Sequence, residues 1–158
     1  MKIILSFLLF LFIVTPCFAM SGKVVKVTDG DTITVLTCQQ KQVKVRLYGI
    51  DAPEKRQPFG QRAKESLSRL IAGKKVNVEE TGKDRYGRVV GIVKAGSVNV
   101  NEKMIYDGFA WVYDSFCKKS FCSSWKDKQS RARAEKRGLW RDKNPVEPWK
   151  WRKQKLAV

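Results

Sequence analysis

The sequence predicts an α+β fold that is mostly β, a small barrel that carries a few helices. Three segments near the N-terminus, residues 22–28, 31–37 and 43–48, place apolar residues at alternate positions, which is the period of a β-strand. Short strands that follow one another in a meander are typical of small barrels. Over residues 59–72 the apolar spacing changes to three and four residues, which predicts a helix after the third strand.

The first 19 residues have the pattern of a secretory signal peptide. Lys2 precedes an apolar run at residues 3–14, and residues 17–19 end the segment with small residues at the positions that matter for cleavage. The run is too short for a comfortable membrane span. A retained anchor and lipidation at Cys17 are the alternatives, and Pro16 argues against lipidation. We therefore expect cleavage after this segment, export to the periplasm or the medium, and no stable membrane insertion.

Residues 20–141 are expected to form one domain, followed by a basic tail at residues 142–158. The whole chain holds 32 Lys and Arg against 15 Asp and Glu, a net charge of +17. A charge of this size indicates a polyanionic partner, nucleic acid first and an anionic membrane surface or acidic glycan second. The chain has no histidine, which excludes a histidine general base or metal ligand.

A tight turn at Asp29-Gly30 separates the first two strands. Val25 and Val27 share a strand face with Asp29, and the apolar residues of the next strand share a face with Asp31. Both aspartates are therefore expected at the rim of a core. Taken alone, the stretch also fits a hairpin turn with solvated aspartates.

The third strand leads directly into residues of both charges. Arg46 lies on its polar face, and Pro53 fixes a turn that carries Asp51 and Glu54. Arginine holds phosphate oxygens with a planar fork of donors. Carboxylates beside a phosphate would repel it unless a cation lies between them. The stretch indicates a site for a phosphate and a metal ion, with a polar loop and a surface ion pair as the alternative.

The second half of the chain mixes helix and strand signals. Gly73 is a good stop for the helix at residues 59–72. Asn99 can cap a short helix, with Glu102 in the capping-box position and Gly108 at its end. The basic helix and the tail are expected to bind phosphates without sequence preference. The remaining expected segments are a strand at 74–80, a loop at 81–87, a strand at 88–94, an extended piece at 109–113, a basic helix at 124–137 and an irregular tail at 142–158.

Three cysteines follow the signal peptide. In an oxidising compartment Cys117 and Cys122 are close enough in sequence to form a disulfide, whose short loop is worth roughly 2 kcal/mol. Cys38 would then be free, although the sequence leaves the other pairings open. A zinc site would lack a fourth ligand.

Three groups of residues, in this order, resemble the thermonuclease family, also called micrococcal or staphylococcal nucleases. They are Asp29-Gly30-Asp31-Thr32, then Arg46 with Asp51-Ala52-Pro53-Glu54, then Tyr86-Gly87-Arg88 beyond the helix. The likeness covers about residues 23–140. It implies a five-stranded OB-fold barrel with three helices, and a calcium-dependent endonuclease that hydrolyses DNA and/or RNA and leaves 3′-phosphate ends. We also expect a monomer.

The resemblance implies a role for each matched residue. Glu54 would take a proton from water, and Arg46 and Arg88 would stabilise the five-coordinate phosphorus. Threonine is usual at the position of Ala52, but the backbone carbonyl that the family uses survives this change. The implied Ca²⁺ ligands are Asp31, Asp51 and the Ala52 carbonyl, with Asp29 acting through water. The implied substrate contacts are Arg85, Tyr86 and Tyr113.

Two other functions remain open on the sequence. A non-catalytic OB-fold protein that binds single strands would explain the charge and the barrel, but not three carboxylates in a phosphate-binding groove. A cationic membrane-active protein would need a basic helix with a broad apolar face, which residues 124–137 lack.

Overall fold

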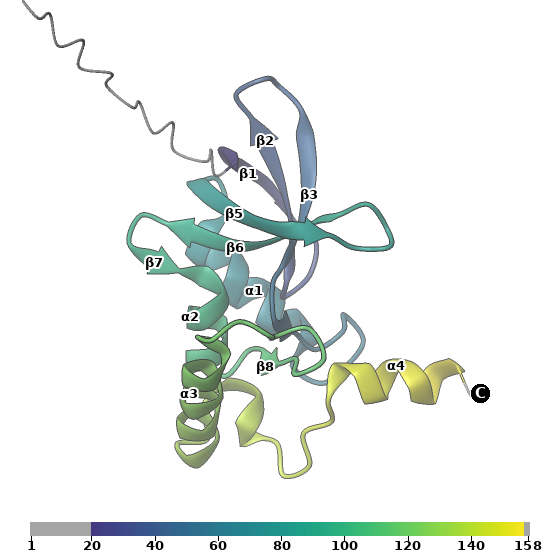
Figure 1. Cartoon of the computed structure of the whole chain (residues 1–158). Helices are drawn as coiled ribbons and strands as arrows, with labels where there is room; N and C mark the ends of the chain where they lie inside the picture. Colours follow the sequence, from purple (N-terminus) through teal and green to yellow (C-terminus); the bar gives the residue numbers. More distant parts are fainter. Residues whose placement is uncertain (1–19, 157–158) are drawn as a thin grey trace, which may run out of the picture.

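The computed structural model of the chain describes residues 20–156 (Figure 1). The predicted signal peptide, residues 1–19, lies outside the described residues, as do residues 157–158. Within the described part, no helix is both long and apolar enough to cross a membrane.

Five strands close into the expected barrel. They are β1 Met20–Val27, β2 Thr32–Thr37, β3 Gln42–Leu47, β5 Lys75–Lys83 and β6 Val89–Ala95. The first three form an antiparallel meander, and β5 and β6 form a hairpin that is longer than the sequence predicted. Antiparallel pairing of β1 with β5 and parallel pairing of β3 with β6 complete the closed sheet. The five-stranded OB-type barrel is therefore confirmed.

One strand face differs from the expectation. In β1 the pairing register with β2 shifts between Val24 and Lys26, which marks a β-bulge. As a result Val24 and Val27 are buried in the core, whereas Val25 is 45% exposed. The predicted face of Val25 and Val27 is wrong because the bulge breaks the two-residue period of the strand.

A second, two-stranded ribbon lies beside the barrel. It pairs β4, Ile50–Asp51, with β8, Trp111–Val112, so the extended piece expected near residue 111 is present. Asp51 stands opposite Trp111 in this ribbon. A further short strand, β7 Val98–Asn99, was not predicted and pairs with the end of β6.

The described residues also form five helical segments. They are α1 Gly60–Ile71, α2 Val100–Tyr106, α3 Cys122–Ala134, the short 3₁₀ helix η1 Gly138–Arg141 and α4 Pro148–Leu156. Asn99 caps α2 as predicted, because its side chain accepts the backbone N–H of Glu102 at 3.1 Å. Leu67 of α1, Met104 of α2 and Trp125 of α3 are buried in one core with the inward face of the strands. This core gives the site a rigid base.

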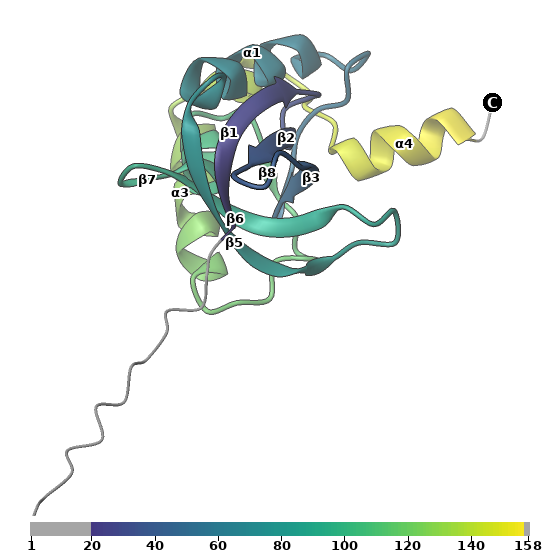
Figure 2. The same cartoon turned by 90° about the horizontal axis from the view of Figure 1, so that it is seen from above.

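The C-terminal segment corrects two expectations. Residues 148–156 form α4, so the tail is not irregular, and the described residues contain four α-helices instead of three. In Figures 1 and 2, α4 and the tip of the β5–β6 hairpin project from the same side of the molecule. The end of the segment that was predicted to be irregular is thus a helix that forms an arm beside the barrel.

Cys117 and Cys122 form the disulfide expected from their spacing, with a Cα–Cα distance of 5.8 Å. Both cysteines belong to the core, and Cys38 is free and exposed. A Cβ atom at Gly49 would lie 2.7 Å from the Cys117 sulfur. The disulfide therefore packs directly beneath the turn that joins β3 to β4.

Candidate active site

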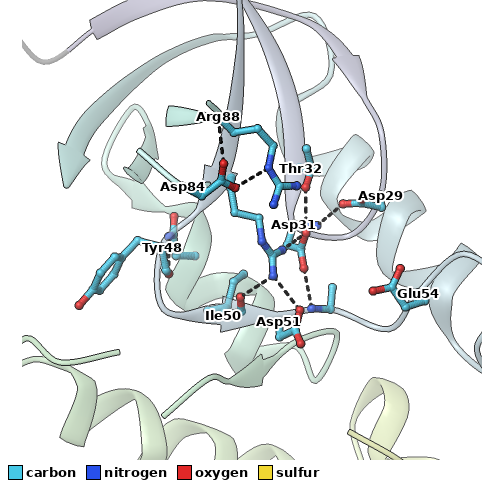
Figure 3. Close-up of polar contacts among 12 residues, drawn as sticks. Asp29, Asp31, Thr32, Tyr48, Ile50, Asp51, Glu54, Asp84 and Arg88 are labelled. Atoms are coloured by element: carbon cyan, nitrogen blue, oxygen red, sulfur yellow. Dashed lines mark hydrogen bonds and ion pairs between the residues drawn. The ribbon is translucent and has the colours of Figure 1, made fainter. Parts of the chain in front are cut away.

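Arg46 of β3 is the centre of the candidate site. Figure 3 labels Asp31, Asp51 and other residues of this site. Its Nη2 donates to Asp51 Oδ1 at 2.7 Å and to the Ile50 carbonyl at 3.3 Å, and its Nη1 forms an ion pair with Asp31. Burial lowers the pKa of Arg46, and the charges of Asp51 and Asp29 oppose this shift. The strand thus holds one guanidinium against one carboxylate from the β1–β2 turn and one from β4.

Asp31 ties the β1–β2 turn to the segment after β4. Its Oδ2 accepts the backbone N–H of Ala52 at 2.8 Å, and its Oδ1 accepts the Thr32 hydroxyl at 3.0 Å. The two segments approach closely because Gly30 has no side chain. A Cβ atom there would lie 2.6 Å from Ala52 Cβ and 2.7 Å from Ala63 Cβ.

Asp29 belongs to the same turn. Its Oδ1 accepts the backbone N–H of Asp31 at 3.1 Å. Burial raises the pKa of Asp29, and the positive charge of Arg46 and a hydrogen bond with Thr32 limit the rise. The structure therefore gathers Asp29, Asp31 and Asp51, three of the predicted acidic residues, around one arginine.

Arg88 enters from the start of β6, which runs beside β3. Its Nε donates to Asp84 Oδ2 at 2.6 Å, and Asp84 Oδ1 accepts the backbone N–H groups of Tyr86 and Arg88. Desolvation would raise the pKa of Asp84, but the hydrogen bonds from Arg88 outweigh it and lower that pKa. Asp84 thus orients Arg88, a positioning role that the sequence analysis missed, although the spacing of four residues across a turn is a usable signal.

Arg85 and Tyr86 form the exposed tip of the same hairpin. Tyr86 is 68% exposed, and its hydroxyl accepts Arg85 Nη2 at 2.7 Å. The guanidinium of Arg88 lies 5.5 Å from the centre of the Tyr86 ring. An aromatic face between two arginines extends from the carboxylate cluster toward solvent.

Glu54 lies beyond β4, on the solvent side of the cluster. Its backbone is fixed, because its N–H donates to Gln57 Oε1 at 3.1 Å and its carbonyl accepts the Gln57 N–H at 2.8 Å. Gly60 makes this packing feasible, since a Cβ there would lie 1.9 Å from the Glu54 carbonyl. The Glu54 side chain is 40% exposed. A fixed backbone with a solvent-reaching carboxylate suits a proton acceptor for water.

Arg152 of α4 is a second residue of the site that the sequence did not predict. Its Nη1 donates to Glu54 Oε1 at 2.6 Å and to Asp51 Oδ1 at 3.2 Å, and its Nη2 donates to Asp51 Oδ2 at 2.8 Å. Burial disfavours its charge, but the hydrogen bonds to Asp51 and Glu54 outweigh burial and raise its pKa. Arg152 lies in the tail that was expected to bind phosphates, and the structure pairs it with two carboxylates of the site.

Aromatic contacts hold the first turn of α4. The Trp149 ring stacks on Tyr113 at 4.9 Å and nearly parallel, and it meets Trp111 edge-on at 6.0 Å. The preceding segment is held by Gln57 Nε2, which donates to the Val146 carbonyl at 2.6 Å. Tyr113, an expected substrate contact, is therefore covered by Trp149.

The donors of the cluster fit a hard divalent cation in chemical type. Asp31 and Asp51 are buried carboxylates, and the Ala52 carbonyl belongs to the same segment. Calcium prefers oxygen ligands of this kind. Within residues 20–156, no three acidic or cysteine side chains form a group that could hold a metal ion. Arginines contact the carboxylates of Asp31 and Asp51 in this arrangement. The carboxylates of the site thus already pair with positive charge, which arginine side chains supply.

Comparisons with known proteins agree with this chemistry. The family described as "Staphylococcal nuclease homologue" matches residues 44–142. An "Uncharacterized endonuclease" of Haemophilus influenzae is 43% identical over 97% of this chain and 86% of its own length. "Protein ParB" of Escherichia coli is 41% identical over 91% of this chain and 86% of its own length. "Micrococcal nuclease" of Shigella flexneri is 41% identical over 84% of this chain and 80% of its own length.

Proposed function

Because this chain belongs to the family of staphylococcal nuclease homologues, a nuclease family, we propose that it is a calcium-dependent endonuclease that hydrolyses DNA and/or RNA to 3′-phosphate ends. One observation carries the proposal. Arg46 on β3 and Arg88, directly before the neighbouring β6, lie at the same end of the barrel as the carboxylates of the site. These carboxylates belong to Asp31, Asp51 and Glu54. A structural ion pair would need no such number of opposed charges.

The proposed reaction starts at Glu54. Its carboxylate takes a proton from a water molecule, and the resulting hydroxide attacks the phosphorus of a phosphodiester. The bond from phosphorus to the 5′-oxygen then breaks, and the 5′-oxygen takes up a proton from solvent. Arg46 and Arg88 donate to the phosphoryl oxygens as their charge grows. Asp84 keeps the Arg88 fork in place.

Calcium is the proposed cofactor. Asp31, Asp51 and the Ala52 carbonyl would hold the ion, with Asp29 acting through water. Bound there, calcium would neutralise charge on the phosphodiester. The chain's own contribution is to keep these oxygens together, which the Asp31–Ala52 hydrogen bond and Gly30 do.

The nucleic acid is proposed to lie against the side from which the hairpin tip and α4 project. Arg85 and Tyr86 present a cation and an aromatic face there. The net charge of +17 supports binding to phosphates without sequence preference. We further propose a monomer that acts after export, in the periplasm or the medium.

A plasmid assay tests the proposal. Purified protein should nick and linearise plasmid with calcium, and an excess of chelator should stop it. The products should accept label from a polynucleotide kinase at once, since they carry 5′-hydroxyl ends, but should prime a polymerase only after phosphatase treatment. Binding of plasmid without cleavage would favour the non-catalytic OB-fold protein instead.

Glu54→Gln sharpens the test. Glutamine keeps the size of the side chain but cannot accept a proton from water, so single-turnover cleavage at saturating calcium should fall about a hundred- to ten-thousand-fold. The exposed glutamate Glu65, which contacts Gln61 on α1, supplies the control Glu65→Gln. Cleavage by Glu54→Gln at the control rate would remove Glu54 from the role of base.

A further inference from the structure

Arg152 and the carboxylates that it contacts form a closed arrangement. The Asp51 side chain is 1% exposed, whereas those of Glu54 and Arg152 are each 40% exposed. Both oxygens of Asp51 accept hydrogen bonds from arginines, and one oxygen of Glu54 accepts from Arg152. In this arrangement arginines contact both carboxylate oxygens of Asp51 and one carboxylate oxygen of Glu54.

Arg152 differs from Arg46 in how it is held. Arg46 belongs to a strand that is paired on both sides, with β2 and with β6. Arg152 is the fifth residue of a nine-residue helix that projects from the body, anchored by Trp149 at its first turn. The segment also lies beyond residues 44–142, the part that matches the family. Arg152 can therefore leave the carboxylates without opening the barrel.

We propose that α4 is a displaceable plug, in which Arg152 occupies the carboxylates of Asp51 and Glu54 until a divalent cation takes them over. The inference rests on the proposed function, since it concerns the same site. A guanidinium and a divalent cation compete here because both need the Asp51 oxygens. The apparent affinity for the cation is then reduced by the fraction of molecules in the closed state.

Displacement has a second effect at the same place. Trp149 covers one face of Tyr113 in the closed state, so release of α4 uncovers an aromatic ring beside the site. The freed Arg152 can then pair with a phosphate oxygen. Binding of the cation thus opens both the carboxylates and an aromatic surface for nucleic acid.

Calcium binding by the full chain, without nucleic acid, tests the plug. Isothermal titration calorimetry should show that Arg152→Gln binds calcium about ten-fold more tightly than the wild type, as expected if about nine in ten wild-type molecules are closed. Lys153→Gln is the matched control, because it removes one positive charge from an exposed residue of the same helix. Its calcium affinity should equal that of the wild type within about two-fold.

A second measurement reads the helix itself. Hydrogen–deuterium exchange of α4 amides in the wild type should accelerate when calcium is added, whereas β2 and β3 should not change. Trp149→Ala should also bind calcium more tightly than the wild type, because it weakens the packing of α4 against the body and leaves the charge of Arg152 in place. Equal affinities of Arg152→Gln and Lys153→Gln, or unchanged exchange of α4, would overturn the plug.

The plasmid assay separates this failure from a failure of the proposed function. Wild-type protein that cleaves plasmid with calcium, together with an Arg152→Gln affinity equal to wild type, refutes the plug and leaves the nuclease in place. If neither protein binds calcium or cleaves plasmid, both are refuted. If only Arg152→Gln binds calcium, the plug is supported in its strongest form.

Discussion

Two arginines contact the same carboxylate from opposite kinds of structure. Arg46 reaches Asp51 from the barrel, at 2.7 Å and with its side chain 15% exposed, and Arg152 reaches it from α4, at 2.8 Å and 40% exposed. The contact chemistry is nearly the same. The two arginines differ in the elements that carry them. Arg46 belongs to a strand that is paired on both sides in the closed sheet, and Arg152 belongs to the projecting helix α4. Similar contact distances to Asp51 therefore do not mean that the two contacts are equally hard to break.

Removal of Arg46 should produce the largest effect. Arg46→Ala leaves the buried carboxylate of Asp31 without its arginine and removes one of the two arginines that contact Asp51, so the free energy of unfolding should fall by about 3–5 kcal/mol. Urea denaturation without calcium measures this. Lys44→Ala, on an exposed residue of the same strand, should lower the free energy of unfolding by less than about 1 kcal/mol. A similar loss in both variants would show that Arg46 is no more structural than its neighbour.

A smaller effect is expected from the residue that aims Arg88. Asp84→Asn removes the carboxylate that accepts Arg88 Nε, so turnover should fall about ten-fold while binding of nucleic acid changes little. Steady-state cleavage kinetics would show the fall in kcat, and Asp127→Asn, on an exposed residue of α3, serves as the control. A rise in KM alone would mean that Asp84 does not position Arg88 for the reaction.

The same pair predicts a pH dependence. The pKa of Asp84 is lowered in the folded protein, so its folded form binds a proton less readily than the unfolded chain does. Its contribution to stability is present above the ordinary pKa of an aspartate and is lost as the pH falls through the lowered value. The difference in stability between wild type and Asp84→Asn should therefore shrink below about pH 4. Melting temperatures of both proteins between neutral and acidic pH would measure it.

Removal of Arg152 should have the smallest effect on stability. Asp51 keeps Arg46, and Glu54 is open to water, so Arg152→Ala should lower the free energy of unfolding by less than about 1 kcal/mol. The same urea series as for Arg46→Ala gives this number. A loss as large as that of Arg46→Ala would place α4 in the permanent structure and erase the contrast between the two arginines.

The same contrast separates what the sequence could predict from what it could not. Arg46, Asp31 and Asp51 lie on strands and turns whose period and turn residues are local, so a reading of neighbouring residues places them together. Arg152 lies 101 residues from Asp51, in a helix without an apolar stripe, and no local pattern points to that contact. The predicted strand face in β1 was wrong for a related reason. The bulge near Val24 arises from the pairing of β1 with β2, which the residues of β1 alone do not reveal.

The parallel pairing of β3 with β6 has a consequence for folding. It joins Arg46 to Val90 across a long stretch of chain, and contacts of large sequence separation form slowly because loop closure must come first. Arg46 and Arg88 become neighbours only when this seam closes. A chain still in the process of folding therefore holds no complete pair of phosphate-binding arginines. The recovery of cleavage after dilution from urea should lag behind the formation of the β1–β3 meander and coincide with closure of the seam.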